Sequence, residues 1–250
     1  MKNINYEKFY TKTNELVEQF ESIANDCIKH DNLEHSFFVD DEYKSSIHVP
    51  FAYGAYDEEK LIGFLSVYSI DNYNIEFCVF VLPDYRNQEI ASNLFFRMVM
   101  DYESRSYRVP IVPGNEAGEC FVKKMGLTFA SCELGMSLSK DNFKAIDDDI
   151  VLKSDIEGEN LIVHGYVDDV CVGQAIVYGD NGYACIHDVE IDEELRQNGY
   201  GYRLMMAVLK DAFFKFNTVV LHLTKENTPA LKLYQKIGFK INEEYNYYEI

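Results

Sequence analysis

Basic residues are scarce in this sequence. Its 250 residues include 23 Lys and Arg against 42 Asp and Glu, which gives a formal charge of −19. A chain this negative repels polyanions, so general binding to nucleic acid or to an anionic membrane surface is not expected. Cationic partners suit its charge better.

Long apolar segments and paired cysteines are also missing. No run of about 18 apolar residues suggests a transmembrane helix, and residues 1–10 lack the apolar core of a signal peptide. The six cysteines are scattered without a C-x-x-C pair, which favours buried thiols in a reducing cytoplasm over disulfides or a zinc site. We therefore expect a cytoplasmic protein without a metal.

The sequence contains an internal repeat. An offset of 110 places Gly63 on Gly173, Val67 on Val177 and Arg86 on Arg196. In each half, two β-rich runs (61–69 and 74–82; 170–179 and 183–191) precede a polar turn and a helix. These patterns predict two copies of one α/β unit, divided near 139–150 into domains 1–140 and 141–250. The first copy begins with a predicted helix over 6–29, for which the second copy has no room.

Charge is distributed unevenly in the second half. Residues 141–194 carry a net −13, whereas residues 195–240 carry +6. A local excess of positive charge in such an acidic protein indicates that this stretch holds an anionic ligand.

The basic stretch opens with the sequence R-Q-N-G-Y-G-Y at 196–202, between the predicted strand 183–191 and a predicted helix over 202–216. A strand, a glycine-bearing turn and a helix N-terminus together bring backbone N–H groups to a phosphate. A lone G-x-G is weak evidence. The full P-loop and dinucleotide-binding patterns are both absent.

The tail of the sequence adds a second motif. Residues 218–224 predict a buried strand, and K-E-N-T-P at 225–229 predicts a turn that opens a helix over 230–237. Gly238 is placed as the C-cap of that helix. Residues 239–241 and 245–250 then predict two closing strands.

Together these motifs resemble a known family. R-x-x-G-x-G after a strand, followed by N-x-x-A-x-x-L-Y-x-K-x-G-F, is similar to the GCN5-related N-acetyltransferases (the GNAT superfamily). The resemblance is tight over about 170–250 and moderate over 50–140. It implies an α/β (α+β) fold of two tandem GNAT-like units, each with a mixed, mostly antiparallel sheet that is splayed at a bulge and flanked by helices.

The resemblance also implies acetyl-CoA as co-substrate and a set of residues that hold it. The loop amides would hold the phosphates, the strand backbone would pair with the pantetheine arm, and Tyr234 would be the general acid for the departing thiolate. Asn227 can contact the cofactor, cap the following helix, or do both. The implied contacts are Val189, Glu190, Ile191, Arg196, Gln197, Asn198, Gly199, Tyr200, Gly201, Tyr202, Asn227 and Tyr234.

The general base is left open because the family varies. Strand alternation places residues 185, 187, 189 and 191 on one face, which makes His187 a candidate. His222 precedes Asn227 by five residues, where some members carry a catalytic glutamate. Glu190 would point to the opposite face unless a bulge rotates it. Transfer through water and an acyl-enzyme at Cys185 are further alternatives.

The first copy departs from the family pattern at three positions. Glu89 stands where the second copy has Gly199, and a carboxylate there would add bulk and repulsion to a phosphate cradle. Val122 and Phe80 replace Tyr234 and Glu190. We expect a degenerate first copy that binds no acetyl-CoA productively and instead supports the second copy as a wall of the acceptor site.

The leading hypothesis is an acetyl-CoA-dependent N-acetyltransferase that acts by direct transfer in a ternary complex, as a monomer or homodimer. Acids such as Asp188, Asp192, Glu193 and Glu194 favour a small cationic amine as acceptor. The alternatives are a non-catalytic acyl-CoA-binding or sensing module, a peptide or protein N-terminal acetyltransferase, and an unrelated nucleotide-binding domain.

Overall fold

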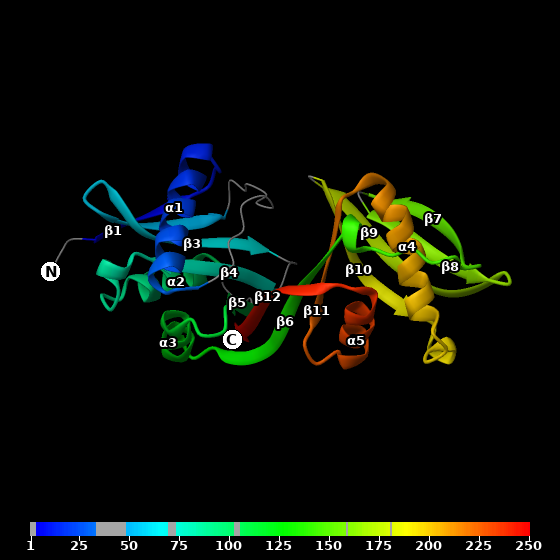
Figure 1. Cartoon of the computed structure of the whole chain (residues 1–250). Helices are drawn as coiled ribbons and strands as arrows, with labels where there is room; N and C mark the ends of the chain where they lie inside the picture. Colours follow the sequence, from blue (N-terminus) through cyan, green and yellow to red (C-terminus); the bar gives the residue numbers. More distant parts are fainter. Residues whose placement is uncertain (1–3, 34–48, 70–73, 103–105, 159, 181) are drawn as a thin grey trace. The chain divides into compact units, whose positions relative to one another are not determined.

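The chain folds into two compact units, as a computed structural model shows (Figure 1). The structure describes all 250 residues except 1–3, 34–48, 70–73, 103–105, 159 and 181. The N-terminal unit comprises residues 1–131 together with 245–250, and the C-terminal unit comprises residues 132–244. The predicted division at residue 140 therefore differs from the one in the structure, which falls inside two strands.

The N-terminal unit has a sheet in the order β1-β2-β3-β4-β5-β12. Its own elements are β1 (Ile4–Phe9), α1 (Asn14–His30), β2 (Ala52–Asp57), β3 (Lys60–Ser69), β4 (Asn74–Val81), η1 (Pro83–Tyr85), α2 (Ile90–Asp101), β5 (Ser106–Ile111) and α3 (Glu116–Met125). The predicted first helix begins later than expected, because residues 4–9 pair with β2 as a strand. The Thr13 hydroxyl then accepts the Leu16 N–H at 3.2 Å and starts α1.

The C-terminal unit has a sheet in the order β6-β11-β10-β9-β8-β7. Its elements are η2 (Lys140–Asn142), β7 (Val151–Glu157), β8 (Asn160–Val167), β9 (Val170–Asp180), β10 (Tyr183–Ile191), η3 (Glu193–Leu195), α4 (Tyr200–Lys215), β11 (Thr218–Thr224) and α5 (Thr228–Ile237). β7 and β8 are adjacent antiparallel strands, so this unit has no counterpart of α1 among its described residues, as the sequence predicts.

Two strands are divided between the units. β6 (Thr128–Ser139) contributes its first four residues to the N-terminal unit and the remainder to the C-terminal unit, where it pairs with β11. β12 (Lys240–Glu249) replaces the two predicted closing strands. Its last residues pair with β5, from Asn246 opposite Ile111 to Glu249 opposite Arg108. The end of the chain thus completes the N-terminal sheet.

Among the described residues, helices cover both faces of the N-terminal sheet and one face of the C-terminal sheet. In the N-terminal unit, α1 packs on a cluster that includes Phe64 and Cys78, whereas α2 and α3 pack on the opposite cluster around Phe77. In the C-terminal unit, α4 packs on β9, β10 and β11, and α5 packs on α4, all in one core (Figure 1). No helix in the described part of the chain is long and apolar enough to cross a membrane.

Candidate active site

The loop between β10 and α4 presents a row of unused backbone donors. Gln197 and Gly199 both adopt left-handed backbone conformations, with φ of 65° and 84°. The five amides from Gln197 to Gly201 make no hydrogen bond to any described residue, whereas Tyr202 and Arg203 donate to the Gly199 carbonyl. Free amides at a helix N-terminus favour an anionic group. The loop therefore has the donors that a pyrophosphate needs.

The side chains of the loop leave this row of amides open. Arg196 Nε donates to the Ile191 carbonyl at 3.0 Å, which fixes the stem of the side chain. The Arg196 side chain is 53% exposed, and its guanidinium lies 3.8 Å from the Glu190 carboxylate. The side-chain amide of Asn198 donates to the carbonyls of Leu195 and Arg196, at 3.3 and 3.2 Å. A Cβ at Gly199 would meet open space, so the left-handed φ, and not crowding, favours glycine at this position.

Part of the positive charge near the loop is already neutralised. Arg203 Nε contacts both carboxylate oxygens of Asp148 at 2.9 Å, and the guanidinium also pairs with Asp149. The hydrogen bond from Arg203 lowers the pKa of Asp148. The acidic stretch before β7 thus binds a base of α4, a use that differs from the predicted attraction of a cationic acceptor.

A bulge in β10 changes which side chains share a face. The pairing of β10 with β9 shifts between His187 and Glu190, and Asp188 has a φ of 49°. Ala184 and Ile186 before the bulge lie in the same core as the partly buried Val189 and Ile191 after it. The predicted sharing of one face by residues 185, 187, 189 and 191 is therefore wrong.

The bulge instead places Glu190 on the face that carries His187, because both alternate with core residues. The His187 imidazole contacts the Asp188 carboxylate at 3.2 Å. His222 on β11 is exposed and alternates with the core residues Leu221 and Leu223. All three candidate bases thus lie on the sheet face opposite α4 and α5.

The two central strands separate beside these candidates. β10 and β11 pair in parallel over three positions, Tyr183–Cys185 with Thr218–Val220. The described remainder of β10, including Val189 and Ile191, has no strand partner on the β11 side. Free backbone groups at such an edge can pair with an extended, amide-containing chain. The splay predicted from the family resemblance is thus present.

Tyr234 lies on the core side of this opening. The side chain is 7% exposed, and its ring packs against Phe239 with 5.8 Å between centroids. Burial raises the pKa of the phenol, so it stays protonated at neutral pH, and no described residue hydrogen-bonds its hydroxyl. Asn227 caps α5 by accepting the Ala230 N–H at 3.3 Å, and Gly238 ends the helix with a φ of 117°.

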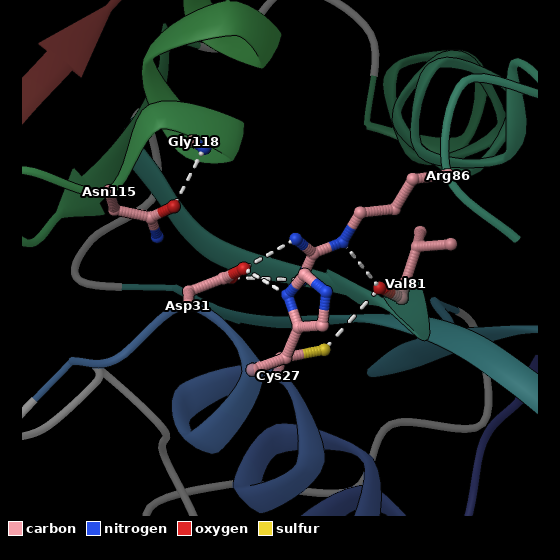
Figure 2. Close-up of polar contacts among 7 residues, drawn as sticks. Cys27, Asp31, Val81, Arg86, Asn115 and Gly118 are labelled. Carbon is pink, nitrogen blue, oxygen red and sulfur yellow. Dashed lines mark hydrogen bonds and ion pairs between the residues drawn. The ribbon is translucent and has the colours of Figure 1, made fainter. Parts of the chain in front are cut away.

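The N-terminal unit repeats this architecture with a different electrostatic arrangement (Figure 2). Arg86 Nε donates to the Val81 carbonyl at 3.1 Å, as Arg196 does to Ile191. However, the two terminal nitrogens of Arg86 donate to Asp31, the C-cap residue of α1, at 2.6 and 2.8 Å. Because the described part of the C-terminal unit contains no such helix, the guanidinium of Arg196 has no bidentate carboxylate partner among the described residues.

The degenerate loop retains its backbone shape. Asn87 and Glu89 have φ values of 60° and 62°, matching Gln197 and Gly199. The Glu89 carboxylate is 62% exposed and pairs with Lys124 of α3. The predicted bulk of Glu89 in the cradle is therefore wrong, and only its charge remains as a barrier to phosphate.

A cavity of about 750 Å³ adjoins this loop in the N-terminal unit. It extends between the diverging β4 and β5 toward the N-termini of α2 and α3, where Asn115 caps α3 through the Gly118 N–H (Figure 2). In contrast to β10, β4 pairs with β3 without a shift in register. The splay here arises without a bulge in β4.

Sequence reasoning did not find the Arg86–Asp31 and Arg203–Asp148 pairs. Each joins a base near a helix N-terminus to an acid 55 residues away. No local spacing signals such a contact. The available signal was the excess of acids at 147–149. It indicates a local negative charge but does not identify Arg203 as the residue that contacts it.

Comparison with known proteins identifies the family. The model of the acetyltransferase (GNAT) family matches residues 14–126 and again 132–239. The chain therefore belongs to the GNAT family and contains two GNAT units in tandem, as the sequence motifs predict. No curated protein matches the sequence.

Solved structures share the fold at low sequence identity. A GCN5-related N-acetyltransferase from Sphaerobacter thermophilus has a TM-score of 0.79 and 11% identity, over 99% of this chain and 95% of that one. A tandem GNAT protein from the clavulanic acid biosynthesis pathway, solved without AcCoA, has a TM-score of 0.67 and 12% identity, over 99% and 98%. A putative acetyltransferase from Pyrococcus horikoshii has a TM-score of 0.62 and 11% identity, over 100% and 90%. These likenesses concern the fold.

Proposed function

We propose that this protein is an acetyl-CoA-dependent N-acetyltransferase whose C-terminal unit acetylates a primary amine. The five unbonded amides from Gln197 to Gly201 carry the proposal, because they form an anion cradle at the start of α4. The exposed guanidinium of Arg196 beside them adds positive charge. Acetyl-CoA supplies the activated acetyl group when it is bound.

The residues around the opening between β10 and β11 suit direct transfer in a ternary complex. A base on the sheet face opposite α4 and α5 would take a proton from the acceptor ammonium, directly or through water. The candidates are His187, Glu190 and His222. Tyr234, neutral and buried on the other side, would donate its phenolic proton to the departing thiolate. The free edge of β10 at Val189–Ile191 would hold the pantetheine arm.

We further propose a small cationic acceptor, a reducing cytoplasmic location, and a structural role for the N-terminal unit. The six cysteines are free thiols, which supports a reducing location. The engagement of Arg86 by Asp31 supports the structural role. A non-catalytic acyl-CoA-binding module remains the alternative, and the retained Tyr234 argues against it.

Calorimetric titration of the full chain with acetyl-CoA, free CoA and ATP tests the donor. We expect one acetyl-CoA site per chain, which Gly199→Glu abolishes by adding a negative charge beside the cradle. Gly158→Glu is the matched control, because Gly158 also has a positive φ and open space around its Cβ. Loss of binding in both variants, or in neither, would contradict this assignment. Two sites per chain would contradict the structural role of the N-terminal unit.

A further inference from the structure

The two units differ most on the sheet face that α1 covers in the N-terminal unit. There the Phe20 ring of α1 stacks on Phe64 of β3, with centroids 4.1 Å apart and ring planes within 5°. Phe64 in turn stacks on Phe80 of β4 at 5.3 Å. This aromatic stack buries the face beneath the helix.

The C-terminal unit has polar side chains at the same register positions. Phe64 pairs with Phe80 across β3 and β4, and Gln174 pairs with Glu190 across β9 and β10. The row continues into β8, where His164 pairs with Gln174. We call His164, Gln174 and Glu190 the polar row. The positions that a helix would cover thus carry groups that favour water or a polar ligand.

The polar row is available for binding. The side chain of Glu190 is 67% exposed, and that of His164 is 28% exposed. Gln174 is half-buried, and its amide makes no hydrogen bond to any described residue. A half-buried amide offers two donors and an acceptor that only a ligand or water can satisfy.

Acidic side chains outnumber the basic ones near the polar row. The bases are Lys153, which pairs with His164 across β7 and β8, and Arg196, whose guanidinium lies 3.8 Å from the Glu190 carboxylate. Glu190 is part of the row, Asp188 lies at the adjacent bulge, and Asp155 of β7 is 4.0 Å from the His164 ring. The row also ends beside His187, on the face that carries the candidate bases. A cationic amine lying along the row would therefore present its nitrogen near these groups.

We propose that His164 and Gln174 determine acceptor specificity, and that the acceptor is a cationic amine with further hydrogen-bonding groups. This inference rests on the proposed acetyltransferase function. Hydroxyl or amino groups of the acceptor satisfy the Gln174 amide and the His164 ring, whereas an apolar amine leaves them unpaired. A site that binds polar groups rejects analogues that lack them.

Steady-state acetylation of spermidine, glucosamine and phenethylamine tests this inference. We expect the full chain to prefer at least one of the two polar amines. Gln174→Leu and His164→Leu should each lower kcat/KM for the preferred polar amine by about tenfold, mainly through KM, as the loss of a hydrogen bond to a cationic ligand does. The Kd for acetyl-CoA should stay within twofold. Gln19→Leu, at an exposed position of α1, is the matched control and should change nothing.

Three results of the acetylation assay would contradict the inference. They are kcat/KM values for both variants that stay within twofold of the parent, a preference for phenethylamine, and acetyl-CoA binding without acetylation of any of the three amines. In each case the calorimetric result for Gly199→Glu stands independently, so failure at the acceptor is distinguished from failure at the donor. Loss of acetyl-CoA binding in the leucine variants would also overturn the inference.

Discussion

At the residue scale, the surroundings of Tyr234 suit a proton donor. Burial raises its pKa, so the phenol carries its proton at neutral pH and can donate it when the thiolate departs. We expect Tyr234→Phe to lower kcat at saturating substrates by roughly 10²–10⁴-fold, with unchanged acetyl-CoA affinity. Tyr248→Phe in the N-terminal unit is the control for loss of a phenol. An unaltered kcat would remove Tyr234 from the mechanism.

The Arg86–Asp31 pair makes a separate prediction about stability. Burial raises the pKa of Asp31, but hydrogen bonds from Arg86 and His30 outweigh it and lower the pKa below its ordinary value. The pair is partly buried and bidentate. Asp31→Asn should therefore reduce the free energy of unfolding of the N-terminal unit by about 1–3 kcal/mol at pH 7.

The pH dependence of this effect follows from the lowered pKa. The contribution of Asp31 is present above about pH 4, the ordinary carboxyl value, and is lost as the pH falls through the folded-state pKa. Denaturation followed by circular dichroism suits a chain with no Trp. Glu89→Gln, which removes an exposed pair with Lys124, should leave the midpoint unchanged. Equal midpoints for Asp31→Asn and the parent at pH 7 would contradict the prediction.

At the scale of elements, the sequence predicted the helices and strands whose ends are determined by residues close to them in the sequence. The bounds of β10 and β11, the Gly238 cap and the start of α5 near Pro229 follow from alternation and capping residues nearby. The position of the bulge at Asp188 was not predicted. A bulge inserts one residue into a strand, and the apolar residues of this strand fit an alternating pattern with or without that insertion. The face of Glu190 depends on that one residue, and the bulge places Glu190 on the face of His187, which is the alternative that the sequence left open.

The first strand is a second element that the local sequence pattern did not predict. Residues 4–9 carry apolar side chains that also fit a helical stripe, and their assignment as β1 depends on pairing with β2, nearly fifty residues later. Thr13 marks the true start of α1. A capping residue within the predicted helix was the local signal that could have moved the boundary.

At the scale of the whole molecule, the tandem repeat was predictable but the exchange of strands was not. A strand pattern at 240–249 fits the edge of either sheet, and only long-range pairing decides that residues 245–250 complete the N-terminal unit. In this unit the Tyr247 hydroxyl donates to the buried Glu76 at 3.0 Å. The Arg108 guanidinium stacks on the Tyr247 ring at 3.8 Å. The last residues of the chain thus anchor the first unit.

This anchoring makes the N-terminal unit depend on the C-terminal end of the chain. Tyr247→Ala should remove a buried ring and the Glu76 hydrogen bond, and so cost the N-terminal unit about 3–5 kcal/mol. Hydrogen exchange should accelerate in β4 and β5, while β8 and β9 keep their protection. Ile241→Ala is the control, because Ile241 lies in the same strand but is 45% exposed and belongs to the C-terminal unit. Unchanged exchange in β5 would mean that pairing with β12 contributes little, and uniform acceleration in both units would mean that they unfold together.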